Sequence, residues 1–215
     1  MARKLYVMSG DVISSRLIKN KESFQERLEK ICYSVNKDYS TDLYAEFKIL
    51  KGIDEIEGVL LNISKMYEII TSILEQLYPY SMRFAFVFDS IDTAVETHDA
   101  SRMDGPAFHK VSDLLKNLKE SKLIFAMSTG NDITDNLISG QINSILLLKK
   151  NWSANQHLIV RKYRETNNQY EVAKELGITQ QAVSKALTRS MWKEIRYIEE
   201  KLNHVLESMN EATGR

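Results

Sequence analysis

Residues 170–187 read YEVAKELGITQQAVSKAL, and this stretch decides the organisation of the C-terminal part of the chain. Ala173 stands where two helices would cross closely, so a small side chain is needed there. Four residues later, Gly177 suits a turn, because glycine takes positive φ without a Cβ penalty. Thr179 can cap the next helix through its hydroxyl, and Val183 returns that helix to an apolar centre. The stretch therefore predicts two helices joined by a tight turn, a helix-turn-helix.

The second helix of this pair has one apolar and one polar face. Its apolar side is expected to join a small centre formed by Val172, Leu176, Ile178, Val183 and Leu187. The outer face carries Gln180, Gln181, Ser184, Lys185 and Thr188. Glutamine can pair bidentately with adenine and lysine can reach guanine, so this face suits the major groove of double-stranded DNA. The pattern also fits a helical hairpin that merely packs on another element.

Basic residues gather around the same stretch. Residues 149–193 contain 9 Lys and Arg against 3 Asp and Glu, whereas residues 1–148 contain 17 against 21. A basic segment beside an acidic one indicates a separate surface for a polyanion. The residues expected to contact phosphates are Lys150, Arg161, Lys162, Arg164 and Arg189. The segment resembles bacterial helix-turn-helix regulators and the DNA-reading region of sigma factors.

The N-terminal part alternates strand and helix patterns in the order β-α-β-β-α-β-α-β. This order predicts an α/β (α+β) fold with a ferredoxin-like sheet and one added unit. After Gly130 the pattern becomes entirely helical. We therefore expect an α/β domain over residues 1–130, a connecting helix over 131–152 and an all-α helix-turn-helix domain over 153–215.

Three segments of the N-terminal part resemble motifs of a bacterial family. Residues 6–16 read YVMSGDVISSR, residues 53–60 read IDEIEGVL and residues 103–108 read MDGPAF. In order and spacing they resemble the SatD family, whose usual forms are G-D-V/I-x-x-S-R, G-D-E-F-Q-G-L and A-D-G-P-A. The first motif matches fully and the others partly. The resemblance covers nearly the whole chain, since members of that family also carry a C-terminal helix-turn-helix.

The acids of these motifs predict a metal site at one end of the sheet. Asp11 follows the first strand, and Asp54 and Glu55 stand in the turn of the next hairpin. The arrangement is similar to nucleotide cyclases, diguanylate cyclases and polymerase palm domains. By that analogy the three acids would hold Mg²⁺ or Mn²⁺ against a nucleotide triphosphate, and Arg16 would face a phosphate. This expectation rests on the likeness of folds.

Several departures from the family pattern argue against activity. Ile53 stands where the family has glycine, and a β-branched residue would crowd an approaching phosphate. Glu57 replaces the family's glutamine and would add a third negative charge to the turn. Bulky phenylalanines in residues 83–89 could fill a nucleotide site. Three interpretations of the acids stay open: solvated turn residues, a metal-bound ligand sensor, and a working nucleotidyl-transfer enzyme.

The last helical stretch has apolar residues at heptad spacing. They are Met191, Ile195, Ile198, Leu202, Val205 and Met209. Such a seam is typical of a two-stranded coiled coil, although the stripe could instead pack on its own chain. Because helix-turn-helix proteins often bind paired half-sites, we expect a homodimer.

Composition sets the remaining bounds. The chain has no apolar run long enough for a transmembrane helix, and a single cysteine, Cys32, excludes an internal disulfide. With no signal-peptide pattern at its start, the cytoplasm is the expected compartment. The sequence thus predicts a DNA-binding regulatory protein whose cyclase-like domain acts as a ligand sensor or assembly module. The alternative is a metal-dependent nucleotide-processing enzyme.

Overall fold

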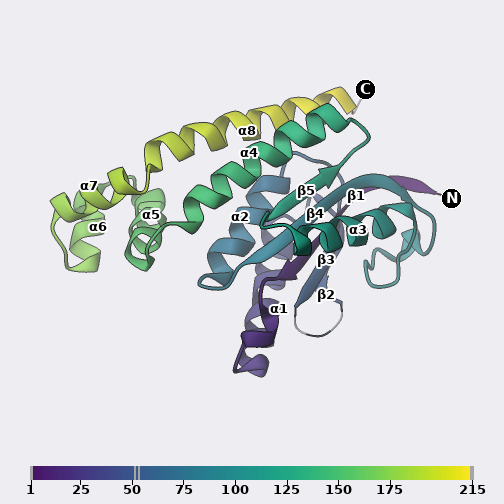
Figure 1. The fold of residues 1–215 in the computed structure, drawn as a ribbon, viewed down its shortest axis with the longest axis horizontal. Helices are drawn as coiled ribbons and strands as arrows, with labels where there is room; N and C mark the ends of the chain where they lie inside the picture. The colour runs from purple at the N-terminus through teal and green to yellow at the C-terminus, as the bar shows by residue number, and fades with distance from the viewer. Residues whose placement is uncertain (1, 51, 53, 214–215) are drawn as a thin grey trace. The chain divides into compact units, whose positions relative to one another are not determined.

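The computed structural model describes residues 2–50, 52 and 54–213 (Figure 1). The chain divides into two compact units, residues 1–142 with 205–215 and residues 143–204. Two long helices, α4 (Asp132–Lys150) and α8 (Trp192–Thr213), contribute residues to both units. From the sequence, divisions are expected at residues 130 and 153 instead. The difference arises because the periodicity of a helix does not reveal where along its length its packing neighbours change.

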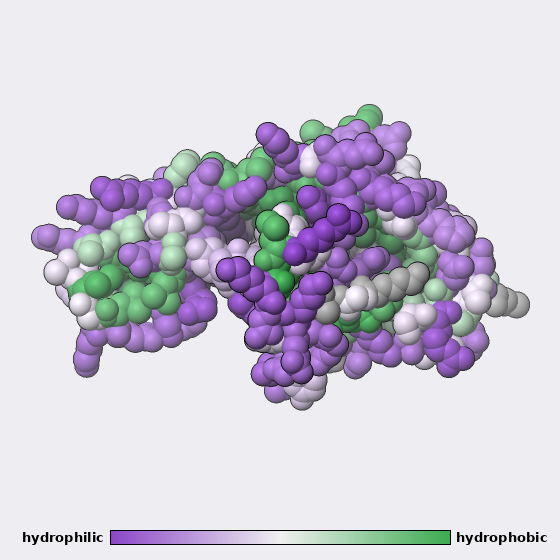
Figure 2. Space-filling view, turned by 60° about the horizontal axis from the view of Figure 1, so that its bottom comes forward, coloured by the Kyte–Doolittle hydropathy of each residue, from purple (hydrophilic) through white to green (hydrophobic). Residues whose placement is uncertain are grey.

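Hydrophilic residues cover most of the face shown in Figure 2, and hydrophobic residues show in smaller areas. Among the residues that the structure describes, no helix combines the length and the apolar character needed to cross a membrane. The 19-residue α4, for example, carries Asp132, Asp135, Lys149 and Lys150.

Unit 1 is built on a five-stranded sheet in the order β2-β3-β1-β4-β5. The strands are β1 (Arg3–Val12), β2 (Leu43–Ile49), β3 (Glu55–Leu60), β4 (Met82–Ile91) and β5 (Phe125–Ser128). All neighbouring strands are antiparallel except β4 and β5, which are parallel.

The helices of unit 1 complete the ferredoxin-like arrangement. With α1 (Lys21–Asp38) and α2 (Met66–Leu77), the first four strands follow a β-α-β-β-α-β order. Helix α3 (Pro106–Glu120) then leads to the parallel strand β5 as an added unit. The predicted α/β fold class is confirmed.

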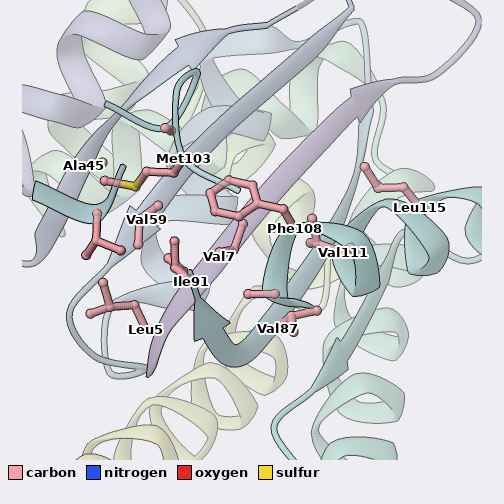
Figure 3. Packing of buried hydrophobic residues seen from close by; sticks show 14 of the residues in the cluster. Leu5, Val7, Ala45, Val59, Val87, Ile91, Met103, Phe108, Val111 and Leu115 are labelled. Atoms are coloured by element: carbon pink, nitrogen blue, oxygen red, sulfur yellow. The ribbon is translucent and has the colours of Figure 1, made fainter. Parts of the chain in front are cut away.

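Side chains alternate between the two faces of the sheet, which separates two sets of residues. Ser9 and Asp11 of β1 share a face with Ala85 and Arg83 of β4, their register partners. Helix α3 packs on this face, where Phe108 and Val111 lie near Val7 in Figure 3. The opposite face carries Met8, Phe84 and Phe86, which are 0% exposed. Helix α3 and the acids of the strand ends therefore belong to one face, and the phenylalanines of β4 to the other.

Unit 2 contains three shorter helices around one small core. They are α5 (Ala154–Thr166), α6 (Gln169–Leu176) and α7 (Gln180–Arg189). The core is formed by Ile159, Val160, Val172, Ala173, Val183, Leu187 and Trp192. Between α6 and α7, Gly177 has the positive φ of 65° that the sequence predicts. Thr179 caps α7 as expected, since its hydroxyl accepts the Ala182 N–H at 3.1 Å.

One residue expected in this core lies outside it. Ile178 is 39% exposed and is not part of the cluster. It lies in the turn between Gly177, which ends α6, and Thr179, which caps α7. The turn carries the side chain away from the packed faces of α6 and α7.

The apolar stripe of α8 is divided between burial and exposure. Ile195 and Leu202 are only 1% and 0% exposed within the chain itself. Val205 is 44% exposed and Ile198 is half-buried. Met191, predicted to begin the stripe, is 45% exposed but precedes α8 and has a φ of 52°. One row of the stripe therefore packs within the chain, as the alternative interpretation holds, and only the other row is open to a partner.

Candidate functional site

The acids of the predicted metal site meet at one end of the sheet. Asp11 pairs in register with Glu55 of β3, and the Val12 N–H donates to the backbone oxygen of Asp54 at 2.7 Å. These contacts form because β1 and the β2–β3 hairpin are antiparallel neighbours. The structure thus brings the three acidic positions together. Ile53, predicted to crowd a phosphate, lies outside the described residues.

Two basic side chains form ion pairs with the Asp11 carboxylate. The Lys119 Nζ lies 2.8 Å from Oδ1, and the Arg83 guanidinium lies 3.4 Å from Oδ2. Asp54 is engaged differently, since its Oδ2 accepts the Ser15 hydroxyl at 2.8 Å. In residues 2–50, 52 and 54–213, no three His, Cys, Asp or Glu side chains are placed to hold a metal ion together. Lys119 and Arg83 therefore supply, at the Asp11 carboxylate, the positive charge that a metal ion would supply.

Sequence reasoning did not find these two cations. Lys119 lies in α3, more than a hundred residues from Asp11, and nothing in its local pattern points to β1. Arg83 is directly opposite Asp11 on β4, which only the strand register reveals. Arg16, expected to face a phosphate, is exposed in the short 3₁₀ turn Ser15–Leu17. Its role stays a prediction.

Glu57 differs from the expectation of a third negative charge. It is 6% exposed on β3, and burial raises its pKa from 4.5 to about 8, with further increases from Glu55 and Asp104. Desolvation penalises the ionised form, so the carboxyl is mostly protonated at neutral pH. A neutral carboxyl resembles the glutamine side chain that the family has at this position. The expectation of a third negative charge is therefore wrong, because burial raises the pKa of Glu57 and favours its protonated form.

The phenylalanines of β4 do not crowd the Asp11 end of the sheet. Phe84 pairs in register with Gly10 and Phe86 with Met8, so both rings lie on the face opposite Asp11. On the Asp11 face, the residues next along β1 and β4 are Ser9 and Ala85, which are small. The expectation that phenylalanines fill a nucleotide site here is therefore wrong, because strand alternation turns them away.

In unit 2, α7 presents most of the residues predicted to read DNA. Gln181, Lys185, Thr188 and Arg189 are exposed, and Ser184 and Gln180 are half-buried. On the inner side, Val183 and Leu187 are 0% and 7% exposed. Helix α7 is therefore amphipathic as the sequence predicts, with a buried apolar side and an accessible polar side.

Of the three basic residues predicted on α5, Arg161 and Lys162 differ in their surroundings. Arg161 is exposed. The Lys162 ammonium lies 2.7 Å from Glu175 and 3.2 Å from Glu165, and hydrogen bonds to these two carboxylates raise its pKa. Lys162 is thus committed to joining α5 and α6, which makes it a weaker candidate for a phosphate contact than Arg161.

The chain resembles known proteins at the level of a family and of distant structures. No curated protein matches it. A bacterial light-regulated adenylyl cyclase is 13% identical, over 60% of this chain and 77% of that chain, with a TM-score of 0.41. A regulator of polyketide synthase expression from Bifidobacterium adolescentis is 11% identical, over 97% of this chain and 82% of that chain, with a TM-score of 0.28.

The family comparison covers far more of the sequence. The SatD family model matches residues 6–204. This span includes the Gly-Asp motif of β1, the acidic hairpin, the start of α3 and the α6–α7 pair. Because the match extends over nearly the whole chain, the protein belongs to the SatD family.

Proposed function

We propose that this protein is a DNA-binding regulatory protein in which α6 and α7 act as a helix-turn-helix. The observation that carries the proposal is the accessible polar face of α7, which stands on a buried core. A helix that enters the major groove needs a rigid inner side and an outer side of hydrogen-bonding residues. Gln181, Lys185 and Thr188 supply that outer side.

The charge of this region supports the same proposal. Residues 149–193 carry 9 basic against 3 acidic residues. Arg189 and Lys185 are exposed on α7, and Arg161 is exposed on α5. Attraction to phosphates supplies nearly all of the non-specific affinity of a DNA-binding protein and a large share of its specific affinity. Arg161 and Arg189 would position unit 2 on the backbone while the α7 face reads bases.

Unit 1 then serves as a ligand sensor or assembly module. Asp11 of β1 and Glu55 of β3 are register partners, but Lys119 and Arg83 hold the Asp11 carboxylate. A regulatory protein of this kind would act in the cytoplasm as a homodimer, so that two copies of α7 reach paired half-sites.

Binding to DNA is tested by replacing two exposed basic residues of α7. The variant Lys185→Ala, Arg189→Ala should bind duplex DNA more weakly than the wild type. Its dependence on salt should also fall, by about one unit of slope for each phosphate that the variant no longer neutralises. The matched control is Lys37→Ala, an exposed lysine of α1 in unit 1, which should leave binding unchanged. A wild type that shifts no genomic fragment in a gel at low salt would refute the proposal.

A metal-dependent nucleotide-processing enzyme is the second candidate. The convergence of Asp11, Asp54 and Glu55 favours it, as do the small neighbours Ser9 and Ala85 on the same face. We expect no release of pyrophosphate from ATP or GTP with Mg²⁺ or Mn²⁺, because Lys119 and Arg83 already contact the Asp11 carboxylate. Pyrophosphate release by the wild type, abolished in both Asp11→Ala and Asp54→Ala, would establish the enzyme instead.

A metal-bound sensor would give a different signature in the same site. Binding of Mn²⁺ without turnover should raise the melting temperature by linkage, and Asp11→Ala should abolish that rise. If turnover and the thermal shift are both missing, the acids are turn residues of a module that acts through its shape.

A further inference from the structure

The first residues of α6 and α7 are joined by a side-chain hydrogen bond. The Gln180 Nε2 donates to the Gln169 Oε1 at 2.6 Å. Each glutamine directly follows a capping residue. Asn168 accepts the N–H groups of Tyr170 and Glu171, and Thr179 accepts that of Ala182. The backbones that carry the two amides are therefore fixed at both helix starts.

This bond determines which hydrogen-bonding groups Gln180 has left to offer. A glutamine amide has two N–H donors and one carbonyl oxygen that accepts. With one N–H given to Gln169, the remaining pair is one donor and one acceptor. In the major groove adenine presents N7 as an acceptor and its N6 amino group as a donor, whereas guanine presents two acceptors, N7 and O6. The remaining groups of Gln180 match adenine and leave one acceptor of guanine unmet.

We infer that Gln180 selects adenine in the DNA site and that Gln169 is the positioning residue that sets this choice. The inference rests on the proposed DNA-binding function. Gln169 need not touch a base. It consumes the N–H that would otherwise let Gln180 donate twice to guanine, and it holds the amide plane in one orientation before DNA arrives. Ordering a long side chain in advance lowers the entropy lost on binding.

The test is selection from randomised duplexes with four proteins: the wild type, Gln180→Ala, Gln169→Ala and the control Gln25→Ala, an exposed glutamine of α1 in unit 1. Selected wild-type sites should contain adenine at one fixed position. Preference over the other bases should be on the order of tenfold to a hundredfold, the range of one bidentate contact. Gln180→Ala and Gln169→Ala should both lose preference at that same position. Gln25→Ala should keep it.

Two further variants separate a positioning role from a general loss of structure. The double variant Gln169→Ala, Gln180→Ala should lose no more preference at that position than either single change, since the residues act as a unit. Gln169→Glu keeps an oxygen that accepts the Gln180 N–H, so adenine preference should return. Overall affinity should fall, because a carboxylate near phosphates is repelled. Thermal melting of every variant confirms that unit 2 stays folded.

The outcomes distinguish this inference from the proposed function. A wild type that binds no duplex overturns both. A wild type that binds but selects guanine at the Gln180 position, or keeps its adenine preference in Gln169→Ala, overturns the inference alone. Loss of preference in Gln169→Ala together with its return in Gln169→Glu supports it.

Discussion

At the scale of single residues, the surroundings of the buried acids in unit 1 determine how each side chain behaves. Glu57 is an acid in the sequence and a mostly neutral hydrogen-bonding group in the fold, because burial raises its pKa to about 8. Asp11 is 6% exposed as well, but Lys119 and Arg83 lie beside its two oxygens. The two buried acids therefore differ in their neighbours, which are other acids for Glu57 and two cations for Asp11.

Glu57→Gln should make folding less sensitive to pH. The raised pKa means that Glu57 favours the folded state fully below pH 4.5, and that this contribution is lost as the pH rises towards about 8. At pH 8 the loss should be on the order of a few kcal/mol relative to the glutamine variant. Denaturant unfolding between pH 5 and 9 measures it. Parallel curves for the two proteins would contradict the burial argument, and Glu26→Gln, an exposed position on α1, is the control.

Removing either end of the Asp11–Lys119 ion pair should have unequal effects on stability. Asp11→Ala leaves the Arg83 side chain, only 17% exposed, without this carboxylate, and should lower the free energy of unfolding by about 2–3 kcal/mol. Lys119→Ala removes an ammonium that is 52% exposed, and should cost less than about 1 kcal/mol. Denaturant titration of both variants compares them. Equal losses would show that burial does not control these pairs.

At the scale of elements, local signals determine the turn between α6 and α7. Gly177 has a φ of 65° and ends α6, while Thr179 begins the cap of α7. Gly140 lies within α4 and does not have a positive φ. A Cβ at either position would meet no atom within 4 Å. The two glycines therefore differ in backbone conformation and not in available space.

Alanine at these two glycines should act in opposite directions. Gly177→Ala should destabilise the protein by about 1 kcal/mol, because a left-handed conformation strains a residue with a Cβ. Gly140→Ala should stabilise it by roughly 0.5–1 kcal/mol, because alanine loses less backbone entropy in a helix. Thermal or denaturant unfolding of both variants gives the comparison. A stabilised Gly177→Ala protein would show that the turn conformation is not needed.

At the scale of the whole molecule, the burial of α8 limits how two copies can assemble. A coiled coil would need both rows of the α8 stripe, but Ile195 and Leu202 are already buried in the chain. A dimer through α8 can use only the outer row, of which Ile198 and Val205 lie in α8, whereas Met191 precedes the helix and has a φ of 52°. Changes at Leu202 would unfold the chain before they reported on assembly.

Val205→Lys therefore tests the homodimer without disturbing the interior. Val205 is 44% exposed, so the melting temperature of the variant should stay close to that of the wild type, while a charge in the outer row should separate the copies. Light scattering at about tens of micromolar, a range that detects modest interfaces, should show a dimeric wild type and a monomeric variant. A wild type that is already monomeric at that concentration would end the dimer proposal.

The sequence by itself determined the features that depend on near neighbours. The strand and helix order of unit 1, the positive φ at Gly177, the Thr179 cap and the two faces of α7 all follow from periodicity, turn chemistry and capping. These signals act over a few residues, so they can be read along the chain. The family motifs also indicated that Asp11, Asp54 and Glu55 would meet, as the strand register places them.

Only the tertiary structure decided which side chains these residues contact and how deeply they are buried. It set Lys119 of α3 against Asp11, buried Glu57 until its pKa rose, and turned Phe84 away from the acids. It also joined Gln169 to Gln180 and buried one row of α8. Each of these outcomes depends on which faces pack together. Electrostatic and desolvation energies are set by distance and burial in space, and neither quantity is contained in the spacing of residues along a chain.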